Sequence, residues 1–491
     1  MSRRALLIPG PVALLALYFG ARLGLSPLRH FDLFFHLAGG RYILEHGFTR
    51  VDPFSLTGTA GWVPHEWGFG VLCVLLVKAL GAAGPALLTG ALVAANMLVL
   101  WAVIGRAMPR RGLLALGVLG LVLAVQSPTW TQERPFHVGH LLFALTVLGT
   151  QAWRAGNDRL LWFSPLLGVA WANLHGSWLL GPALLGATAV GQALDVPEQR
   201  PRAVRALAAS VAMFLVAAVS PSGPGIWLYP IQHSLLRSTQ NINEWVPINL
   251  TAGWSWAYLA LFGAALFCVG QAPVRRFAIL LPTLVLGLAA LKVQRHAPFA
   301  AVLLAVALLE HAAQGQGLGW PERLRHPFRA IDQAFARWSA AAHGALWPTV
   351  ALLVLAGVSW RNPIPVEQGL LRQRYPLNCF EALRKLPPGK VLNAFVIGGA
   401  LSYFAGPDYK VFIDSRNDPF PQPIHDDYVR LIWLEPGWQE PLARYSPDYL
   451  LWEWDSPGNI LLEQLQLRGG WREVIRDGQY VLWARAQPDA P

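Results

Sequence analysis

The sequence predicts an α-helical polytopic membrane protein with a small α/β domain at its C-terminal end. Of the 491 residues, 54% are hydrophobic and only 14% are charged, whereas soluble domains carry about 25% charged residues. The apolar residues form long runs that short polar segments separate, and such runs indicate membrane-spanning helices. After residue 360, charges, turn prolines and strand-like runs return. We therefore expect a multi-pass domain over 1–360 and a soluble domain over 361–491.

About eleven apolar runs fit the length of a membrane span, which takes roughly 20 residues and fewer where the bilayer thins. The first run, 5–20, is interpreted as an uncleaved span, because no clean small-residue cleavage site follows it. The run 66–80 is short and contains Lys78. The further spans are 85–104, 112–126, 138–153, 160–174, 178–194, 206–220, 254–272, 277–291, 297–310 and 345–360.

The basic residues set the orientation, since cytoplasmic loops are enriched in Lys and Arg. Arg3 and Arg4 place the N-terminus in the cytoplasm. If 66–80 crossed the membrane, the cluster around Arg110 would lie outside, so we predict an interfacial helix there. Alternation then puts the C-terminal domain outside the cytoplasm. It puts these further arginines inside: Arg154, Arg159, Arg200, Arg202, Arg205, Arg275, Arg276, Arg323, Arg325, Arg329 and Arg337.

This distribution also explains the formal charge of +11 without nucleic acid as a partner. The Ala-, Leu-, Arg-, Gly- and Pro-rich composition is typical of a GC-rich bacterial genome, so the predicted location is the bacterial inner (plasma) membrane. Cys73, Cys268 and Cys379 lie far apart and form neither a disulfide framework nor a metal-ligand spacing. No metal and no cofactor are predicted.

The C-terminal domain is expected to be mixed α/β. Four stretches are typical of strands, with a hairpin turn at Asp477-Gly478 in the last of them. A short helix over 380–386 should stop at Pro387-Pro388-Gly389. The four strand-like stretches are 391–396, 410–414, 449–454 and 474–485.

Unusual polar residues gather on the side that the threading places outside the cytoplasm. Ionisable groups near membrane depth are costly, and they are functional candidates for that reason. The candidates are, in chain order, Asp32, His36, Arg41, Asp52, His65, Glu66, Trp67, Arg134, His137, Asn173, His175, Glu244, Trp245, Arg295 and His296, with Asp414 and Arg416 in the C-terminal domain.

Each candidate also has a structural interpretation. Tryptophans such as Trp67 and Trp245 are typical of the interfacial belt, and Asp52-Pro53 is typical of a turn. Glu66 suits a helix N-terminus, and Arg134 and Arg295 suit contact with lipid headgroups. His175 and His296 suit helix ends, and Asp414 with Arg416 suits an ion-pair network. Candidates from six separate segments of the chain, all on one side, are harder to explain in this way than the candidates of any single segment.

A site outside the cytoplasm has no nucleotide sugars, so an activated sugar there must be carried by a lipid. A polyprenyl-phosphate sugar needs cationic partners for its phosphate, and Arg134, His137, Arg295 and His296 meet that need. It also needs a carboxylate that takes the proton of the acceptor hydroxyl. Asp32 is the first candidate for this base, followed by Glu66 and Glu244. Aromatic faces and Asn173 suit sugar rings.

The pattern resembles the GT-C superfamily of membrane glycosyltransferases. In that family an acidic residue lies at the start of the first outer loop, as Asp32 does, and a His-containing motif precedes the second span, as His65-Glu66-Trp67 does. The chain is most similar to an uncharacterised bacterial GT-C-like group. The shared elements are Asp-x-x-x-His-Leu-x-x-Gly from Asp32, Asp-Pro-Phe-Ser from Asp52, His-Glu-Trp from His65, Asn-Leu-His-Gly from Asn173, Glu244-Trp245, and Phe412 to Asp418.

The resemblance implies an inverting transfer of a sugar from a polyprenyl-phosphate donor to an extracytoplasmic glycan, lipid or protein. His36, Arg41, Asp52, His65, Trp67, Asn173, His175 and Trp245 would contact substrate, with Asp414 and Arg416 near the acceptor. Many GT-C enzymes carry a second acidic residue beside the first, whereas Leu33-Phe34-Phe35 follow Asp32, so no metal is implied. Two alternatives stay open: a non-catalytic polysaccharide or lipid-carrier transporter or scaffold, and a lipid-linked glycan ligase or polymerase.

Overall fold

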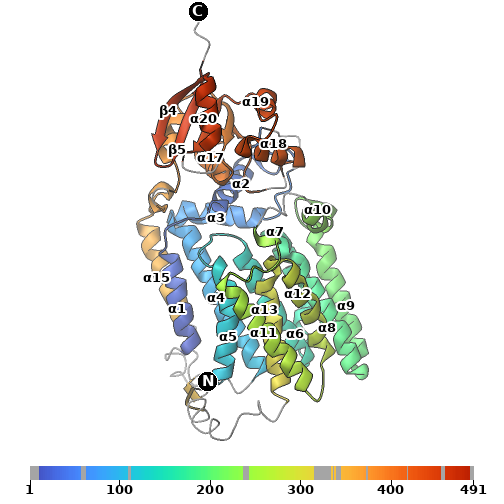
Figure 1. Cartoon of the computed structure of the whole chain (residues 1–491). Coiled ribbons are helices and arrows are strands. Elements are labelled where there is room, and N and C mark those ends of the chain that lie inside the picture. The colour runs from blue at the N-terminus through green and yellow to red at the C-terminus, as the bar shows by residue number, and fades with distance from the viewer. Residues whose placement is uncertain are drawn as a thin grey trace, which may run out of the picture. The chain divides into compact units, whose positions relative to one another are not determined.

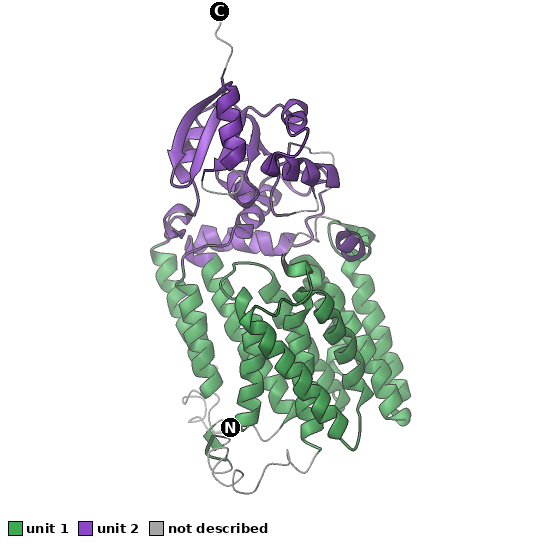
Figure 2. Ribbon diagram, viewed as in Figure 1, with its two compact units in different colours: residues 1–26, 85–228, 240–362 green, residues 27–84, 229–239, 363–491 purple. Residues whose placement is uncertain are grey.

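The structure, a computed structural model, divides the chain into two compact units (Figure 2). Unit 1 comprises residues 1–26, 85–228 and 240–362, and unit 2 comprises 27–84, 229–239 and 363–491. The described residues are 10–56, 62–108, 112–235, 243–314, 333–335, 337–338, 344, 346–371, 374–416, 419–454 and 459–486. Arg3, Arg4, Arg110, Arg323, Arg325, Arg329 and Asp418 lie outside them.

Unit 1 is helical, and a helix lies over each predicted span apart from residues 5–9, which are not described (Figure 1). These helices follow from long apolar runs whose backbone groups must be hydrogen-bonded within the helix when lipid is the solvent. They are α1 (Pro11–Gly24), α4 (Ala83–Ala107), α5 (Leu113–Gln126), α6 (Phe136–Arg154), α7 (Arg159–Leu174), α8 (Leu180–Asp195), α9 (Arg200–Leu215), α11 (Gly253–Gln271), α12 (Phe277–Lys292), α13 (Ala297–Ala312) and α15 (Leu346–Arg361).

Four helical stretches among the described residues are long and apolar enough to cross a membrane: Ala83–Ala107, Gly176–Asp195, Pro197–Ala218 and Gly253–Gln271. Shorter apolar helices accompany them, α1, α5, α12 and α15 among them. The fold class is thereby confirmed as a multi-pass, mainly helical membrane protein with a C-terminal mixed sheet. The number of crossings and their orientation stay predictions.

Ion pairs join several helix ends in unit 1. Arg154, at the end of α6, donates two hydrogen bonds of 3.0 Å to Glu310, near the end of α13. Arg276, just before α12, lies 3.4 Å from the same carboxylate. Arg202 donates to Asp158 at 2.6 Å. These arginines therefore lie at one end of unit 1, and their placement on the cytoplasmic side of the membrane stays a prediction.

Unit 2 combines helices with one five-stranded sheet of order β2-β1-β3-β5-β4. β1, β2 and β3 pair in parallel, and β5 pairs antiparallel with β3 and β4. The strands are β1 (Gly389–Asn393), β2 (Tyr409–Val411), β3 (Tyr449–Glu453), β4 (Trp471–Asp477) and β5 (Tyr480–Arg485). The helices are α2 (Asp32–His46), α3 (Trp67–Leu80), α10 (Tyr229–Leu235), α16 (Leu377–Leu383), α17 (Gly398–Phe404), α18 (Gln422–Trp433), α19 (Gln439–Tyr445) and α20 (Asn459–Arg468).

The predicted strands and the predicted short helix of this domain are confirmed, within a few residues at their ends. The turn at Asp477-Gly478 joins β4 to β5, and Gly478 has a φ of 58°, which glycine adopts without strain. Helices α17 to α20 were not predicted. α17 begins with Gly398-Gly399 and α18 has Pro421 and Pro423 at its start, and both features are usual signs of a loop.

The first polar segment, which the sequence assigned to the multi-pass domain, lies in unit 2. Its helices α2 and α3 cross at Gly40 and Gly70, where a Cβ on Gly40 would lie 2.4 Å from the carbonyl of Gly70. Only glycine allows this approach. Residues 54–56 pair with Val411 at the edge of β2. The predicted interfacial helix corresponds to α3, and its place at the membrane surface stays a prediction.

Candidate functional site

The candidate residues gather in separate clusters, of which the first lies in unit 1. We call Arg134, Glu244 and Arg295 the arginine clamp. Arg134 donates to one oxygen of Glu244 at 2.5 Å, and a guanidinium nitrogen of Arg295 lies 3.9 Å from the other oxygen. The two guanidinium groups therefore approach the same carboxylate from residues far apart in sequence.

Short loop elements position the clamp. Arg134 precedes α6, Glu244 lies in the 3₁₀ turn η8 (Asn243–Trp245), and Arg295 lies in η9 (Gln294–His296) between α12 and α13. A backbone hydrogen bond of 2.9 Å from Gln294 to Val246 holds η9 beside η8. Aromatic faces support both cations, since Arg295 lies 5.4 Å from the ring of Trp245 and Arg134 lies 5.2 Å from that of Phe136.

The clamp is reachable from solvent and carries net positive charge. The side chains of Arg134, Arg295 and Glu244 are 20%, 30% and 34% exposed. Two guanidinium groups and one carboxylate leave one positive charge, and guanidinium geometry matches phosphate as well as carboxylate. A lipid-borne phosphate is therefore a chemically suitable partner for these two arginines.

The two predicted histidine ligands lie close by in sequence. His296 follows Arg295 in η9. His137 lies in the first turn of α6, is 2% exposed, and has a ring nitrogen 3.0 Å from the carbonyl of Gln132. That contact holds the His137 ring in place, so its predicted contact with phosphate stays a proposal.

The second cluster lies in unit 2 and consists of Asp32, His36, His65 and Glu66, which we call the acid–histidine cluster. Glu66 precedes α3, and its two oxygens lie 3.7 Å from ring nitrogens of His36 and His65 respectively. Asp32 and His36 are four residues apart on α2 and so share one face of that helix. The crossing of α2 with α3 brings this face to Glu66.

Asp32 begins α2 and is only 4% exposed. Its backbone N–H donates to Nδ1 of His30 at 3.2 Å, and the same ring atom lies 3.8 Å from a carboxylate oxygen of Asp32. A helix N-terminus favours a negative charge, which suits a carboxylate that must stay ionised in a buried place. The position is therefore suited to a base, provided that a hydroxyl group can reach it.

A third cluster, Asp52–Arg416–Asp414, is fully internal to unit 2. Arg416 donates to both oxygens of Asp52, at 2.8 and 3.0 Å, and its Nε lies 2.9 Å from both oxygens of Asp414. Burial raises the pKa of Asp52, but the charge and hydrogen bonds of Arg416 outweigh that effect and lower it overall. Burial raises the pKa of Asp414. These contacts are those of an internal tie between the Asp52 segment and the residues that follow β2.

Several other predicted substrate contacts have partners within their own unit. Arg41 donates to the carbonyl of Tyr403 at 2.6 Å. Asn173 donates to the carbonyls of Val169 and Val219, both at 2.8 Å, at the end of α7. His175 accepts from the backbone of Ser177 and caps η3 (Gly176–Leu179). Trp67 packs edge-on against Phe48, with ring centroids 5.1 Å apart. Their contact with substrate stays a prediction.

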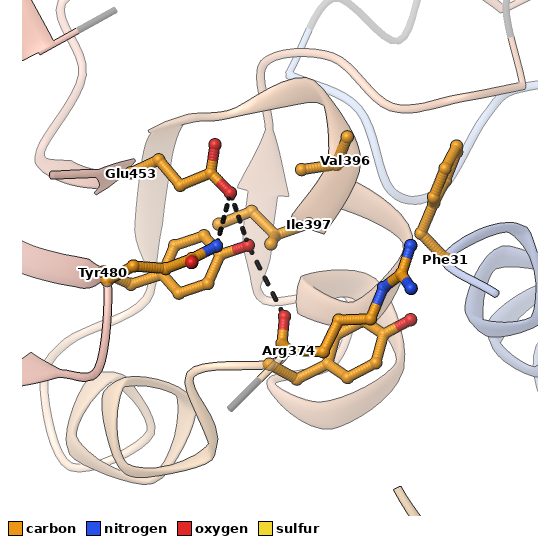
Figure 3. Close-up of a pocket in the computed structure, with 8 residues that line it drawn as sticks. Phe31, Arg374, Val396, Ile397, Glu453 and Tyr480 are labelled. Atoms are coloured by element: carbon orange, nitrogen blue, oxygen red, sulfur yellow. Dashed lines mark hydrogen bonds between the residues drawn. The ribbon is translucent and has the colours of Figure 1, made fainter. Parts of the chain in front are cut away.

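Sequence reasoning missed one neighbour of the acid–histidine cluster and one cavity. The ring of Tyr229, from α10, lies 4.4 Å from that of His65, and its hydroxyl lies 3.4 Å from Nε2. A partly open cavity of about 470 Å³ lies in unit 2 (Figure 3). Its lining residues are Phe31, Arg374, Tyr375, Val396, Ile397, Glu453, Gln479 and Tyr480. No local motif marks these residues, because folding alone brings them together. Among the described residues, no three His, Cys, Asp or Glu side chains gather as metal ligands would.

Comparison with solved structures shows the fold. The archaeal oligosaccharyltransferase AglB from Archaeoglobus fulgidus, in complex with an inhibitory peptide and a dolichol-phosphate, matches with a TM-score of 0.59. Sequence identity is 12%, over 98% of this chain and 74% of AglB. The apo form of the Archaeoglobus fulgidus oligosaccharyltransferase matches with a TM-score of 0.53 at the same identity and coverage. The chain thus shares the fold of this archaeal oligosaccharyltransferase over almost its whole length.

A third structure, ArnT from Cupriavidus metallidurans bound to undecaprenyl phosphate, matches with a TM-score of 0.47 and 13% identity over 96% of both chains. At that score the likeness adds nothing to the fold assignment. No family model matches the chain. No curated protein matches it either.

Proposed function

We propose that this protein transfers a sugar from a polyprenyl-phosphate donor to an acceptor outside the cytoplasm, with inversion at the anomeric carbon. The observation that carries the proposal is the arginine clamp. Two guanidinium groups on aromatic faces, partly open to solvent, converge on one anion in a membrane unit. The fold shared with AglB supports this proposal without establishing the reaction.

The donor phosphate would bind Arg134 and Arg295 by charge-assisted hydrogen bonds, replacing the carboxylate of Glu244. As the bond between the anomeric carbon and the phosphate oxygen breaks, negative charge grows on that oxygen. Fixed cations at such a position stabilise the transition state more than the ground state. His137 and His296 are proposed as additional donors to the same phosphate.

Asp32 is the proposed base. Its carboxylate takes the proton of the acceptor hydroxyl, the oxygen attacks the anomeric carbon, and polyprenyl phosphate leaves with the bonding electron pair. Asp32 is preferred to Glu244, whose oxygens already face two guanidinium groups, and to Glu66, which lies between two imidazoles. In this proposal Glu66 and His36 position the face of α2 that carries Asp32.

Transfer of radiolabelled sugar from a polyprenyl-phosphate sugar to added glycan, lipid or protein acceptors, in membranes that contain the full chain, tests the proposal. Asp32→Asn keeps the shape of the side chain and removes the base. We expect it to lower the rate by about 100- to 10,000-fold, the contribution of a general base. Asp426→Asn, on the exposed side of α18, should leave the rate unchanged.

Full activity of Asp32→Asn would remove Asp32 from the reaction. Binding of donor by the wild-type protein without any transfer, across glycan, lipid and protein acceptors, would contradict the transferase proposal. It would favour the transporter or scaffold alternative instead.

A further inference from the structure

Unit 2 contains a cavity that none of the proposed roles uses. It is partly open and has a volume of about 470 Å³, a size within the range of small-molecule sites. Figure 3 shows Glu453 and Tyr480 on one side, the guanidinium group of Arg374 extending toward Phe31, and Val396 and Ile397 between them. The cavity is therefore a candidate for a ligand much larger than an ion.

The polar wall of the cavity is built around Glu453, at the end of β3. Its Oε1 accepts a hydrogen bond of 2.8 Å from Gln479 and one of 2.9 Å from the hydroxyl of Tyr480. Tyr480 is 3% exposed, and burial raises the pKa of its hydroxyl, so it remains a donor at neutral pH. These bonds fix the carboxylate, which as an ionised group is a hydrogen-bond acceptor only.

The lining selects for a neutral ligand rich in hydroxyl groups. A simple anion would face the Glu453 carboxylate, and a simple cation would face the Arg374 guanidinium group. A hydroxyl group satisfies both, since it donates to carboxylate and accepts from guanidinium. The rings of Phe31 and Tyr375 add flat apolar surface that suits the C–H face of a sugar.

The cavity also lies on the elements that carry the proposed base. Phe31 directly precedes Asp32, and its ring stacks on His30 at 4.7 Å. Val396 and Ile397, in η11 (Phe395–Ile397), directly precede α17, which packs on α2. A Cβ on Gly399 would lie 3.0 Å from the backbone nitrogen of Phe35. The packed helices α17 and α2 therefore join the cavity to the start of α2 within unit 2.

We propose that the cavity between Phe31, Arg374, Glu453 and Tyr480 binds a neutral sugar unit of the acceptor. The transferred sugar would then be added to a glycan rather than to a protein side chain or a simple lipid. The role of the bound sugar as part of the acceptor rests on the proposed function. The existence of a site for a neutral sugar does not rest on it.

Saturation-transfer NMR on the full chain in lipid nanodiscs provides the test. The probes are maltotriose and the methyl α-glycosides of glucose, mannose and galactose, with glucuronate, glucosamine and inorganic phosphate for comparison. At least one neutral probe should bind, and the charged probes should bind more weakly. Arg374→Ala and Glu453→Ala should each weaken that binding by about 10-fold or more, the loss expected for hydrogen bonds to charged groups.

Matched controls are Arg384→Ala and Glu463→Gln, two exposed positions of the same unit outside the cavity lining; both should bind sugar as the wild-type protein does. A wild-type protein that binds none of the neutral probes would overturn the proposal. So would unchanged binding in folded Arg374→Ala protein, which removes only an exposed side chain, or a preference for phosphate or glucuronate.

The two proposals fail in different ways. If sugar binding depends on Arg374 and Glu453 but Asp32→Asn still transfers sugar, the cavity stands and the base assignment falls. If Asp32→Asn abolishes transfer while cavity variants bind sugar normally, the transferase proposal stands and the cavity proposal falls.

Discussion

Unit 1 contains two ion clusters of the same composition, each with two arginines around one glutamate. One is the arginine clamp, Arg134–Glu244–Arg295. The other, which we call the arginine lock, is Arg154–Glu310–Arg276. Arg134 precedes the 19-residue helix α6, and Arg154 is its last residue, so the clusters lie roughly 28 Å apart along this helix at 1.5 Å per residue.

The two clusters differ in what holds them. In the lock, Glu310 lies in α13 and is 10% exposed, and Arg154 binds both of its oxygens in parallel at 3.0 Å. In the clamp, all three residues lie in turns between helices and are 20–34% exposed. Aromatic rings rather than helix backbones support its cations. The lock joins helix ends, whereas the clamp is the cluster for which we propose an exchange of anion.

The comparison teaches that residue type does not separate a structural ion pair from a binding site. Both clusters consist of the same charges, and the sequence marked the arginines of both. What distinguishes them is whether the carboxylate sits in a helix or in a turn, and whether solvent reaches it. These features follow from the fold.

The largest expected effect separates the clusters by ligand affinity. Replacing both clamp arginines, Arg134→Gln with Arg295→Gln, should weaken binding of undecaprenyl phosphate by about 100-fold or more, since each charged hydrogen bond contributes about 1.5–3 kcal/mol. Native mass spectrometry on protein in nanodiscs measures this. Arg154→Gln, the matched change in the lock, should leave the affinity unchanged. An equal loss of affinity for undecaprenyl phosphate in the clamp and lock variants would contradict the proposed difference between the two clusters.

The buried cluster of unit 2 should behave as a second lock. Arg416→Met leaves two carboxylates without their cation, and we expect a loss of about 3–5 kcal/mol in the free energy of unfolding. The wild-type protein should lose stability as the pH falls below 3.8, the ordinary value for aspartate, because the pKa of Asp52 is lowered in the folded state. Asp414, whose pKa is raised, opposes part of this acid effect.

Thermal unfolding as a function of pH checks both statements. If Arg416→Met melts like the wild-type protein, the Asp52–Arg416–Asp414 cluster does not stabilise the fold of unit 2. A selective loss of acceptor use in a protein of unchanged stability would restore the predicted acceptor role of Asp414 and Arg416.

The smallest expected effect compares the two glutamates. Glu310→Gln should destabilise unit 1 by about 3 kcal/mol, because it leaves the mostly buried Arg154 without its charge partner. Glu244→Gln should cost less than about 1 kcal/mol, since partly exposed ion pairs contribute little. Thermal melting of the two variants side by side measures the difference. Similar losses would show that the clamp is structural as well.

The sequence predicted the helices of unit 1 and the strands of unit 2 because each is encoded locally, by apolar runs, alternation and the Asp477-Gly478 turn. It also named the three clamp residues as separate candidates, since charges near membrane depth are conspicuous, but not the contacts between them. It missed α17 to α20, of which α17 starts with glycines and α18 with prolines. It also placed the Asp32–Glu66 segment with the multi-pass domain. That segment belongs to unit 2 because of long-range contacts such as that of Phe54 with Val411.

The cavity and Tyr229 were beyond sequence reasoning for the same reason. The cavity is lined by Phe31 together with Arg374, Glu453 and Tyr480, which lie hundreds of residues further along the chain. No regular sequence spacing connects these four residues. Asp52 and Arg416 were named separately, as a loop residue and a residue after a strand. Only the fold shows that the guanidinium group of one holds the carboxylate of the other.

The most direct test of the central claim is a cryo-EM map of the full chain in nanodiscs with undecaprenyl phosphate. The account predicts phosphate density within hydrogen-bond distance of Arg134 and Arg295, with the side chain of Glu244 displaced from its present position between them. Phosphate density at the Arg154–Glu310 end, or at neither cluster while Glu244 keeps both arginines, would contradict it.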